Sequence, residues 1–317
     1  MVRIGQRGPE IFPLVLGGNV FGWTAGRPAS FAILDAFRAA VPAGQPIMID
    51  TAEGYSSWVP GNDGYESERI IGEWIAARGP KHVLVATKTG GHRDHRNLDP
   101  DRVRAAIDGS LERLGVESID LYWAHYDDEH VSLAEQVAVF GELVASGKAK
   151  RIGLSNYTPE RLRAWIEEAS RQEQELPIAF QPHYNLVHRN DVEDHVVPIA
   201  EEHGIGLLPY YALASGFLAG KYRERVEAGA SPRAAGASKY ATPQGLAIVD
   251  ELERIGNAHG ASVAATALAW LRAQPTVAAP IASASRAEQV ADLVASATLS
   301  LTVEDLAVLD KVSTWTP

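Results

Sequence analysis

Apolar runs and amphipathic segments alternate along nearly the whole chain. Eight short runs are apolar on both faces, a pattern typical of parallel strands that are buried between helices. The intervening segments carry apolar residues at helical spacing. The pattern therefore predicts a parallel sheet covered by helices, with strands at residues 14–16, 46–49, 82–87, 119–124, 150–154, 178–181, 205–209 and 277–282.

Start and stop signals define two of the helices best. Residues 100–114 follow Asp99, a good N-cap, and stop at Gly115. Residues 132–145 begin with Ser132 in the spacing of a capping box. The other expected helices cover residues 29–40, 66–77, 158–169, 191–203, 244–259, 262–271, 286–295 and 303–312.

Eight successive strand–helix units favour an α/β fold that closes into a single (β/α)8 barrel. A doubly wound open sheet is the alternative, and it would usually carry a GxGxxG turn after its first strand. The residues that follow the first strand here, 17–19, read Gly-Gly-Asn and lack that fingerprint. We find no repeat and no linker, which predicts one domain over residues 1–317. Long loops are expected at residues 56–65 and 212–243, on the active-site face.

Composition limits the kinds of binding partner and the cellular compartment that we expect for this protein. A net charge of −11 argues against nucleic acid or an anionic membrane surface as the main partner. The chain has no cysteine, which excludes disulfides, thiol nucleophiles and zinc–thiolate sites. No apolar run approaches the roughly 18–20 residues that a membrane helix needs, and residues 1–10 do not resemble a signal peptide. We expect a cytoplasmic protein.

Four chemically reactive residues lie where three consecutive strands end. Asp50 closes the second strand and Tyr55 follows it, Lys88 closes the third strand, and His125 closes the fourth. In a parallel barrel the carboxyl ends of all strands open on one face, where active sites lie. An acid, a phenol, an amine and an imidazole are therefore expected to meet in one pocket, which makes the chain an enzyme candidate.

Other residues admit two interpretations. The clusters at residues 92–95 and 125–130 contain histidines and acids, but neither has HExxH spacing on a helix, and no metal site is expected. Trp23, Trp58 and Tyr126 fall on three separate loops that follow strands. They predict an aromatic wall for the substrate, or else they simply anchor those loops.

Several motifs in chain order extend this constellation. They are Asp-Thr-Ala-Glu-Gly-Tyr at residues 50–55, Ala-Thr-Lys at 86–88, Leu-Tyr-Trp-Ala-His at 121–125, Gly-Leu-Ser-Asn-Tyr at 153–157, Gln-Pro-His-Tyr-Asn at 181–185, Gly-Lys-Tyr at 220–222 and Ala-Glu-Gln at 287–289. Together the motifs resemble those of the aldo-keto reductases of the long-chain bacterial type, over nearly the whole chain.

The resemblance implies an oxidoreductase that interconverts a carbonyl compound and an alcohol by hydride transfer. Tyr55 would be the general acid or base, Lys88 would lower the pKa of its phenol, and Asp50 would hold Lys88 charged. His125 would donate a hydrogen bond to the substrate oxygen. Small carbonyl compounds or alcohols are the implied substrates.

The resemblance also implies a nicotinamide cofactor in the second half of the barrel. NADP(H) is favoured because Arg286 offers charge to a 2′-phosphate, and NAD(H) is possible. The residues expected to bind the cofactor are Gly18 and Asn19 after the first strand; Ser155, Asn156, Gln181 and Tyr210 around the nicotinamide; Leu213, Gly216 and Lys221 over the pyrophosphate; and Ser283, Ser285, Arg286 and Gln289 at the adenosine end.

Two rival functions remain open at this level. One is a barrel isomerase without a cofactor that uses Tyr55 and His125 for proton transfer. The other is a regulatory or binding protein that keeps the cofactor without turnover. The sequence does not indicate the oligomeric state.

Overall fold

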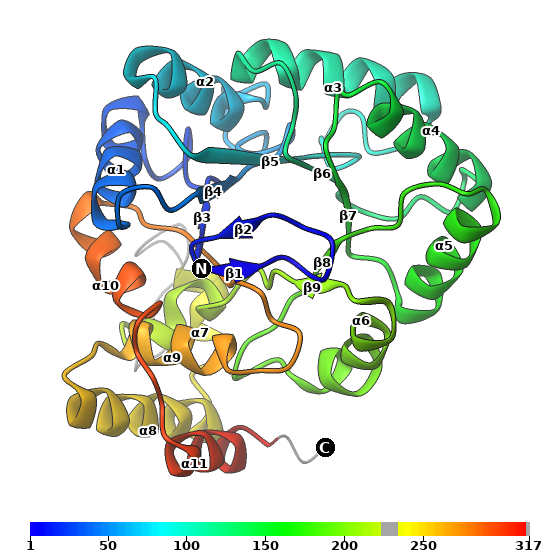
Figure 1. Cartoon of the computed structure of the whole chain (residues 1–317). Coiled ribbons are helices and arrows are strands. Elements are labelled where there is room, and N and C mark those ends of the chain that lie inside the picture. The colour runs from blue at the N-terminus through cyan, green and yellow to red at the C-terminus, as the bar shows by residue number, and fades with distance from the viewer. Residues whose placement is uncertain (223–233, 315–317) are drawn as a thin grey trace.

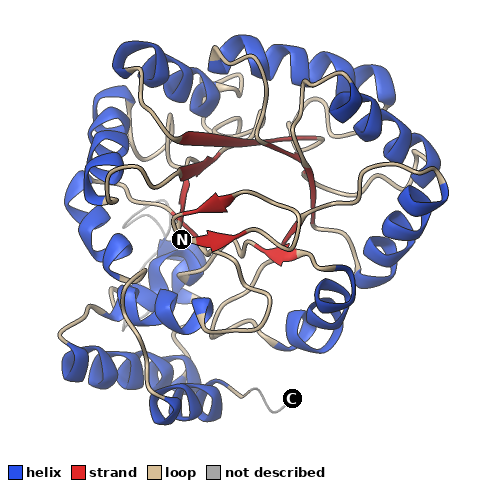
Figure 2. Cartoon of the chain, viewed as in Figure 1, coloured by secondary structure: helices blue, strands red, loops and turns tan. Residues whose placement is uncertain are grey.

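The computed structural model describes residues 1–222 and 234–314. Its main sheet has eight parallel strands in the order β10-β3-β4-β5-β6-β7-β8-β9, and the helices surround them (Figures 1 and 2). A bridge between Leu207 and Val277, just before β10, closes the ring, which confirms the (β/α)8 barrel. The strands are β3 Val15–Gly17, β4 Ile47–Asp50, β5 Val83–Thr89, β6 Leu121–Ala124, β7 Ile152–Ser155, β8 Ala179–Gln181, β9 Gly206–Leu207 and β10 Ile281–Ala282.

The register of the strands brings their carboxyl ends level with one another. Gly17 at the end of β3 pairs with Asp50 at the end of β4. On the other side of the barrel, Ser155 at the end of β7 pairs with Gln181 at the end of β8. Residues that are distant in the sequence therefore share one rim of the barrel.

The expected helix signals are confirmed where they were strongest. The side chain of Asp99 accepts hydrogen bonds from two backbone amides of α3, which ends at Gly115 in the left-handed conformation. Ser132 and Glu135 form the capping box of α4. The main helices are α1 Arg27–Ala40, α2 Glu66–Arg78, α3 Pro100–Leu114, α4 Leu133–Ala145, α5 Pro159–Arg171, α6 Val197–His203, α8 Pro243–His259, α9 Val263–Arg272, α10 Val290–Ala295 and α11 Val303–Ser313.

Three segments differ from the pattern expected. The helix expected at residues 191–203 begins as a π-helical turn, η1 Val192–Val196. Pro198 near the start of α6 has no amide hydrogen for a bond to the preceding turn, which favours that wider turn. The helix expected at residues 286–295 begins as a short 3₁₀ turn, η3 Ala287–Gln289. The long loop expected at residues 212–243 contains η2 Ala214–Ala219 and α7 Ala234–Ser238, and its residues 223–233 lie outside the described chain.

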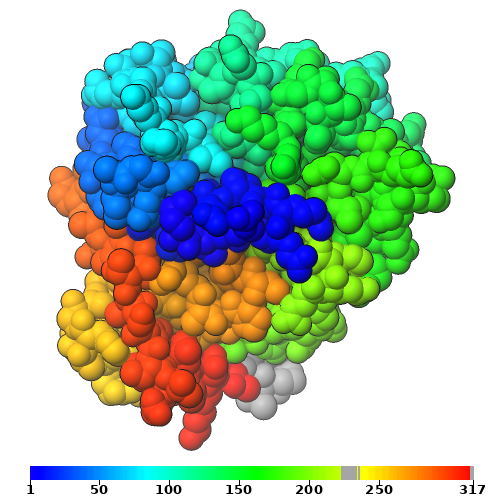
Figure 3. All heavy atoms as spheres, viewed as in Figure 1, coloured from blue at the N-terminus to red at the C-terminus, as the bar shows by residue number. Residues whose placement is uncertain are grey.

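A short hairpin that the sequence pattern did not predict covers the amino end of the barrel. Its strands are β1 Val2–Arg3 and β2 Glu10–Ile11, and Figure 3 shows it across the middle of that face. Ile4 and Ile11 are fully buried and pack with the side chains that fill the barrel interior. The opposite, carboxyl end is therefore left for a site.

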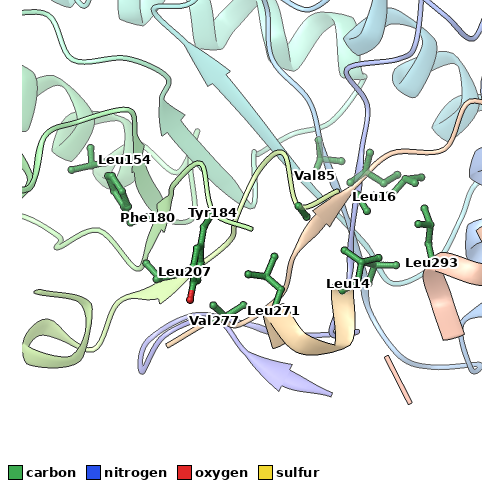
Figure 4. Packing of buried hydrophobic residues seen from close by; sticks show 14 of the residues in the cluster. Leu14, Leu16, Val85, Leu154, Phe180, Tyr184, Leu207, Leu271, Val277 and Leu293 are labelled. Carbon is green, nitrogen blue, oxygen red and sulfur yellow. The ribbon is translucent and has the colours of Figure 1, made fainter. Parts of the chain in front are cut away.

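A second apolar layer lies between the strands and the helices. Figure 4 shows part of it, with Leu14, Leu16, Val85, Leu154 and Phe180 from the barrel wall and neighbouring segments. Among the described residues, no helix is both long and apolar enough to span a membrane.

Candidate active site

A cavity of about 970 Å³ opens at the carboxyl ends of the strands. Of the residues that the sequence analysis proposed for chemistry, cofactor and substrate, Gly18 and Lys88 do not line it. Lys88 lies just beneath the wall, in contact with two residues that do line it. The barrel therefore brings together residues from position 17 to position 293 of the chain.

Lys88 is fully buried and forms the centre of the reactive cluster. Its Nζ donates to Asp50 Oδ2 at 2.5 Å, to the carbonyl oxygen of Thr51 at 2.7 Å and to Tyr55 Oη at 2.9 Å. Asp50 is 2% exposed, and its other carboxylate oxygen accepts a bond from Gln181. Tyr55 Oη accepts this bond from Lys88, and Tyr55 itself lines the cavity.

Burial dominates the protonation of this cluster. It raises the pKa of the Tyr55 phenol well above its usual range, and the charge of Asp50 raises that pKa further. Burial also raises the pKa of Asp50 and lowers that of Lys88, while their attraction opposes both changes. The pKa of Tyr55 is therefore raised overall and not lowered as we expected, because desolvation of the phenolate is the largest effect in this cavity. Tyr55 is a protonated phenol at neutral pH.

His125 follows β6 and faces the ring of Tyr55, with the ring centroids 6.0 Å apart. Burial lowers the pKa of its imidazole well below the usual value, as do the charges of Lys88 and Arg96. Its Nδ1 is buried and has no hydrogen-bond partner in the described chain. This favours the neutral tautomer in which Nε2 carries the proton.

Two buried acids, to which the sequence analysis gave no role in the site, hold the strand that carries Lys88; one of them, Glu68, was expected on an exposed helix face but is fully buried. Glu53 is fully buried and accepts bonds from Thr89 Oγ1 and from the amide of Gly90, and it pairs with Arg102 of α3. Glu68 likewise accepts a bond from Thr87 Oγ1 at 2.5 Å and pairs with an arginine of α3. Hydrogen bonds to buried carboxylates thus hold β5 at Thr87 and Thr89, the two residues that flank Lys88.

The amide side chains on the far side of the cavity form a connected network. Asn156 adopts a left-handed backbone conformation, with φ of 57°. Its Nδ2 donates to the carbonyl oxygen of His125, and its Oδ1 accepts from the hydroxyl of Tyr210 at 2.8 Å. Ser155 donates to the carbonyl oxygen of Gln181, which in turn bonds Asp50. This network links the proposed nicotinamide residues directly to the reactive cluster.

The segment after Tyr210 and Tyr211 is bent by three successive residues with positive φ. These are Ala214, Ser215 and Gly216, with φ of 48°, 59° and 96°. A glycine takes up such a conformation at little cost, and its backbone can approach a ligand closely. Leu213, Gly216 and Lys221, which the sequence analysis proposed for the pyrophosphate, line the cavity here.

The remaining end of the cavity is formed after β10. Ser283 Oγ donates to Asn19 Oδ1, and Ser285 donates through both its amide and its hydroxyl to Gln289. Arg286 also lines this end. Gly18 instead lies behind the wall, where its amide bonds to the carbonyl oxygen of Asp50.

Three aromatic side chains line the opposite, outer part of the cavity. Trp58 is 48% exposed and packs edge-on against Trp23 at 5.6 Å and Tyr55 at 6.2 Å between ring centroids. Tyr126 stacks on His125 at 4.6 Å. The three loops predicted to carry an aromatic wall therefore converge beside Tyr55.

The sequence analysis had not proposed a role in the site for some other lining residues. Asp292 faces the same end of the cavity as Arg286, and Thr24, Ser215 and Tyr222 line other parts of it. Asp292 could have been found three residues after Gln289, one turn along a helix. Within the described ranges, no group of three His, Asp or Glu side chains is placed to hold a metal ion.

Comparison with known proteins adds an independent line of evidence. The model of the aldo/keto reductase family matches residues 13–314. The oxidoreductase YrpG of Bacillus subtilis is 30% identical, over 98% of this chain and 94% of its own. The L-glyceraldehyde 3-phosphate reductase of Escherichia coli O157:H7 is 31% identical, over 83% and 78% of the two chains. The NADH-specific methylglyoxal reductase of Escherichia coli K12 is 29% identical, over 89% and 86%.

Proposed function

This chain belongs to the aldo/keto reductase family of oxidoreductases, and on that premise we propose that it reduces an aldehyde or ketone with NADPH, or oxidises the alcohol in reverse. Tyr55 is the proposed proton donor. The observation that carries the proposal is the bond from the buried Lys88 ammonium to the Oη of Tyr55, a tyrosine that lines the cavity.

The wall of the cavity fits a nicotinamide dinucleotide. Arg286 and Lys221 supply positive charge, and the positive-φ turn at Ser215 and Gly216 allows close approach of a phosphate. Tyr210 offers a ring face, and Asn156 and Gln181 offer amide groups beside the reactive cluster. A reduced nicotinamide bound there would supply the hydride for the carbonyl carbon.

The residues of the chain would handle the proton and the orientation of the substrate. A protonated Tyr55 gives its proton to the carbonyl oxygen as negative charge develops there. Lys88 then stabilises the phenolate that remains, and Asp50 keeps Lys88 in place. Neutral His125 donates from Nε2 to the same oxygen and fixes its direction.

Steady-state assays of the purified chain test this function. Oxidation of NADPH and NADH would be followed with a panel of aldehydes, ketones and sugars that includes glyceraldehyde 3-phosphate and methylglyoxal, the compounds in the names of two relatives. Turnover of at least one carbonyl compound is expected. If neither cofactor is oxidised with any compound, the proposed function is wrong. An isomerase or a cofactor-binding protein without turnover would then be the better explanation of the site.

Preference for NADPH is proposed from the charge of Arg286. Arg286→Ala is expected to weaken NADPH binding by about ten- to a hundredfold, because charge-assisted hydrogen bonds are worth about that much in affinity. NADH lacks the 2′-phosphate, and its binding should change little. Fluorescence titration of both cofactors measures the difference.

Arg254→Ala is the matched control for this experiment. Arg254 is an exposed arginine on α8, paired with Glu251, and it does not line the cavity. Its removal should leave the binding of both cofactors unchanged. Equal weakening of NADPH and NADH by Arg286→Ala would show that Arg286 contacts another part of the cofactor. In that case the negative charge of Asp292, which lines the same wall, would disfavour the 2′-phosphate of NADPH. NAD(H) would then be the better candidate for the cofactor.

Trp58 is proposed to favour the binding of large, ring-containing substrates. Trp58→Ala should raise KM for ring-containing substrates by about five- to tenfold, since an aromatic contact and its buried area are lost. Small aldehydes and cofactor affinity should be little affected, and Trp58→Phe should recover most of the loss. A uniform loss of kcat/KM over small and bulky substrates would mean that Trp58 supports its loop instead.

A further inference from the structure

Arg96 and Arg286 differ from every other arginine that the structure describes, because they form neither an ion pair nor a hydrogen bond within that part of the chain. The others pair with acids or donate to backbone carbonyls. The chain has 40 acidic residues against 29 basic ones. With acids in such excess, an unpaired arginine is unusual, and Arg286 already has a proposed anionic ligand.

Arg96 lies beside the reacting end of the cavity. It is exposed, and its guanidinium carbon lies 4.3 Å from the centroid of the Tyr126 ring. That ring stacks in turn on His125, and both Tyr126 and His125 line the cavity. The neighbouring arginine, Arg93, is paired with Asp94. A cation without an acidic partner thus lies on Tyr126, whose ring stacks on the histidine that is proposed to bind the carbonyl oxygen.

Among the described residues that line the cavity, no acid is placed to form an ion pair with Arg96. Asp50 is bound by Lys88, and Asp292 lies at the distant, adenosine end. A guanidinium can stack on an aromatic ring and still present its N–H groups in the plane to a carboxylate or phosphate. Arg96 does not itself line the cavity, but its guanidinium stacks on Tyr126, which does. An available positive charge therefore lies next to the aromatic part of the cavity wall.

We propose that Arg96 selects carbonyl substrates that carry an anionic group, a carboxylate or a phosphate, a few bonds from the carbonyl carbon. This inference rests on the proposed carbonyl reduction. Arg96 acts as a specificity-determining residue: it binds the anionic end while Tyr55 and His125 act on the carbonyl oxygen. A role limited to packing on Tyr126 would affect charged and neutral substrates alike.

Matched substrate pairs and three variants test the proposal. The pairs are succinic semialdehyde with butanal, and glyceraldehyde 3-phosphate with glyceraldehyde. Arg96→Gln keeps much of the side-chain length and removes the charge, while Arg96→Lys keeps the charge. Arg104→Gln removes a charge on α3, where Arg104 pairs with Glu142 and does not line the cavity.

Arg96→Gln is expected to lower kcat/KM for at least one anionic member of the pairs by about tenfold, mainly through KM, and to change the neutral members by less than about twofold. Loss on succinic semialdehyde alone would identify a carboxylate site, and loss on glyceraldehyde 3-phosphate alone a phosphate site. Arg96→Lys should retain part of the preference, and Arg104→Gln all of it. Added salt should reduce the preference of the wild type.

Two results would overturn the inference while leaving carbonyl reduction intact. One is a wild-type enzyme that reduces charged and neutral members equally well. The other is an equal loss on both members in Arg96→Gln. Absence of turnover with every compound and both cofactors would instead remove the proposed function, and this inference with it.

Discussion

Replacing Tyr55 with phenylalanine should lower kcat for carbonyl reduction by about 100- to 10,000-fold, the usual contribution of a general acid. The aromatic ring and its contact with Trp58 remain, and only the hydroxyl group that accepts the bond from Lys88 is lost. Cofactor affinity should stay within about twofold of the wild type, because the proposed cofactor residues lie elsewhere on the wall. Steady-state kinetics and cofactor titration measure the two effects separately.

Tyr65→Phe provides the control for this variant. Tyr65 stacks on His92 and does not line the cavity, and its hydroxyl should be dispensable for turnover. If Tyr55→Phe keeps more than about half of the wild-type rate, the phenol is not the proton donor. Another source of the proton would then have to be sought in the cavity.

Lys88→Met is expected to abolish most of the activity and also to destabilise the fold. Asp50 would remain 2% exposed without its cationic partner, and breaking one side of a buried pair costs about 3–5 kcal/mol of unfolding free energy. The pKa of Tyr55, which burial already raises, should rise further without the neighbouring ammonium. Alcohol oxidation, which needs the phenolate, should therefore require still higher pH. Urea unfolding and pH–rate profiles in both directions measure these changes.

The double variant Lys88→Met with Asp50→Asn separates stability from chemistry. It removes both charges, and it should recover much of the lost unfolding free energy without recovering turnover. Recovery of activity in the double variant would mean that Lys88 acts only as a partner for the buried acid. An active Lys88→Met variant with an unchanged pH–rate profile would contradict its role beside Tyr55.

The fold and the reactive cluster could be predicted because each depends on short, regular signals. Buried strands alternate with helices, and a parallel barrel places the ends of its strands on one rim. Asp50, Tyr55, Lys88 and His125 follow from those two facts. The aromatic residues Trp23, Trp58 and Tyr126 could be assigned to loops on the same face, and the folded chain gathers them.

Other features depend on contacts that no local pattern specifies. Glu53 accepts hydrogen bonds at the end of β5, and its charge is paired by Arg102 of α3, which lies 49 positions away in the sequence. The N-terminal hairpin has strands of two residues, too short to show a period. The direction of the pKa shift of Tyr55 was missed because it depends on how completely the phenol is buried. Sequence alone could identify the charged neighbour but could not weigh it against desolvation.

A single-turnover measurement with deuterated cofactor tests the central claim most directly. Purified protein in excess would be mixed with NADPH that carries deuterium at the transferable position and then with an aldehyde from the panel. The account predicts loss of the reduced-nicotinamide absorbance in proportion to the bound cofactor, with one deuterium on the carbinol carbon of the product. It also predicts that Tyr55→Phe binds the cofactor but shows almost no such loss. Constant absorbance in the wild type, or an alcohol without deuterium, would contradict hydride transfer at this site.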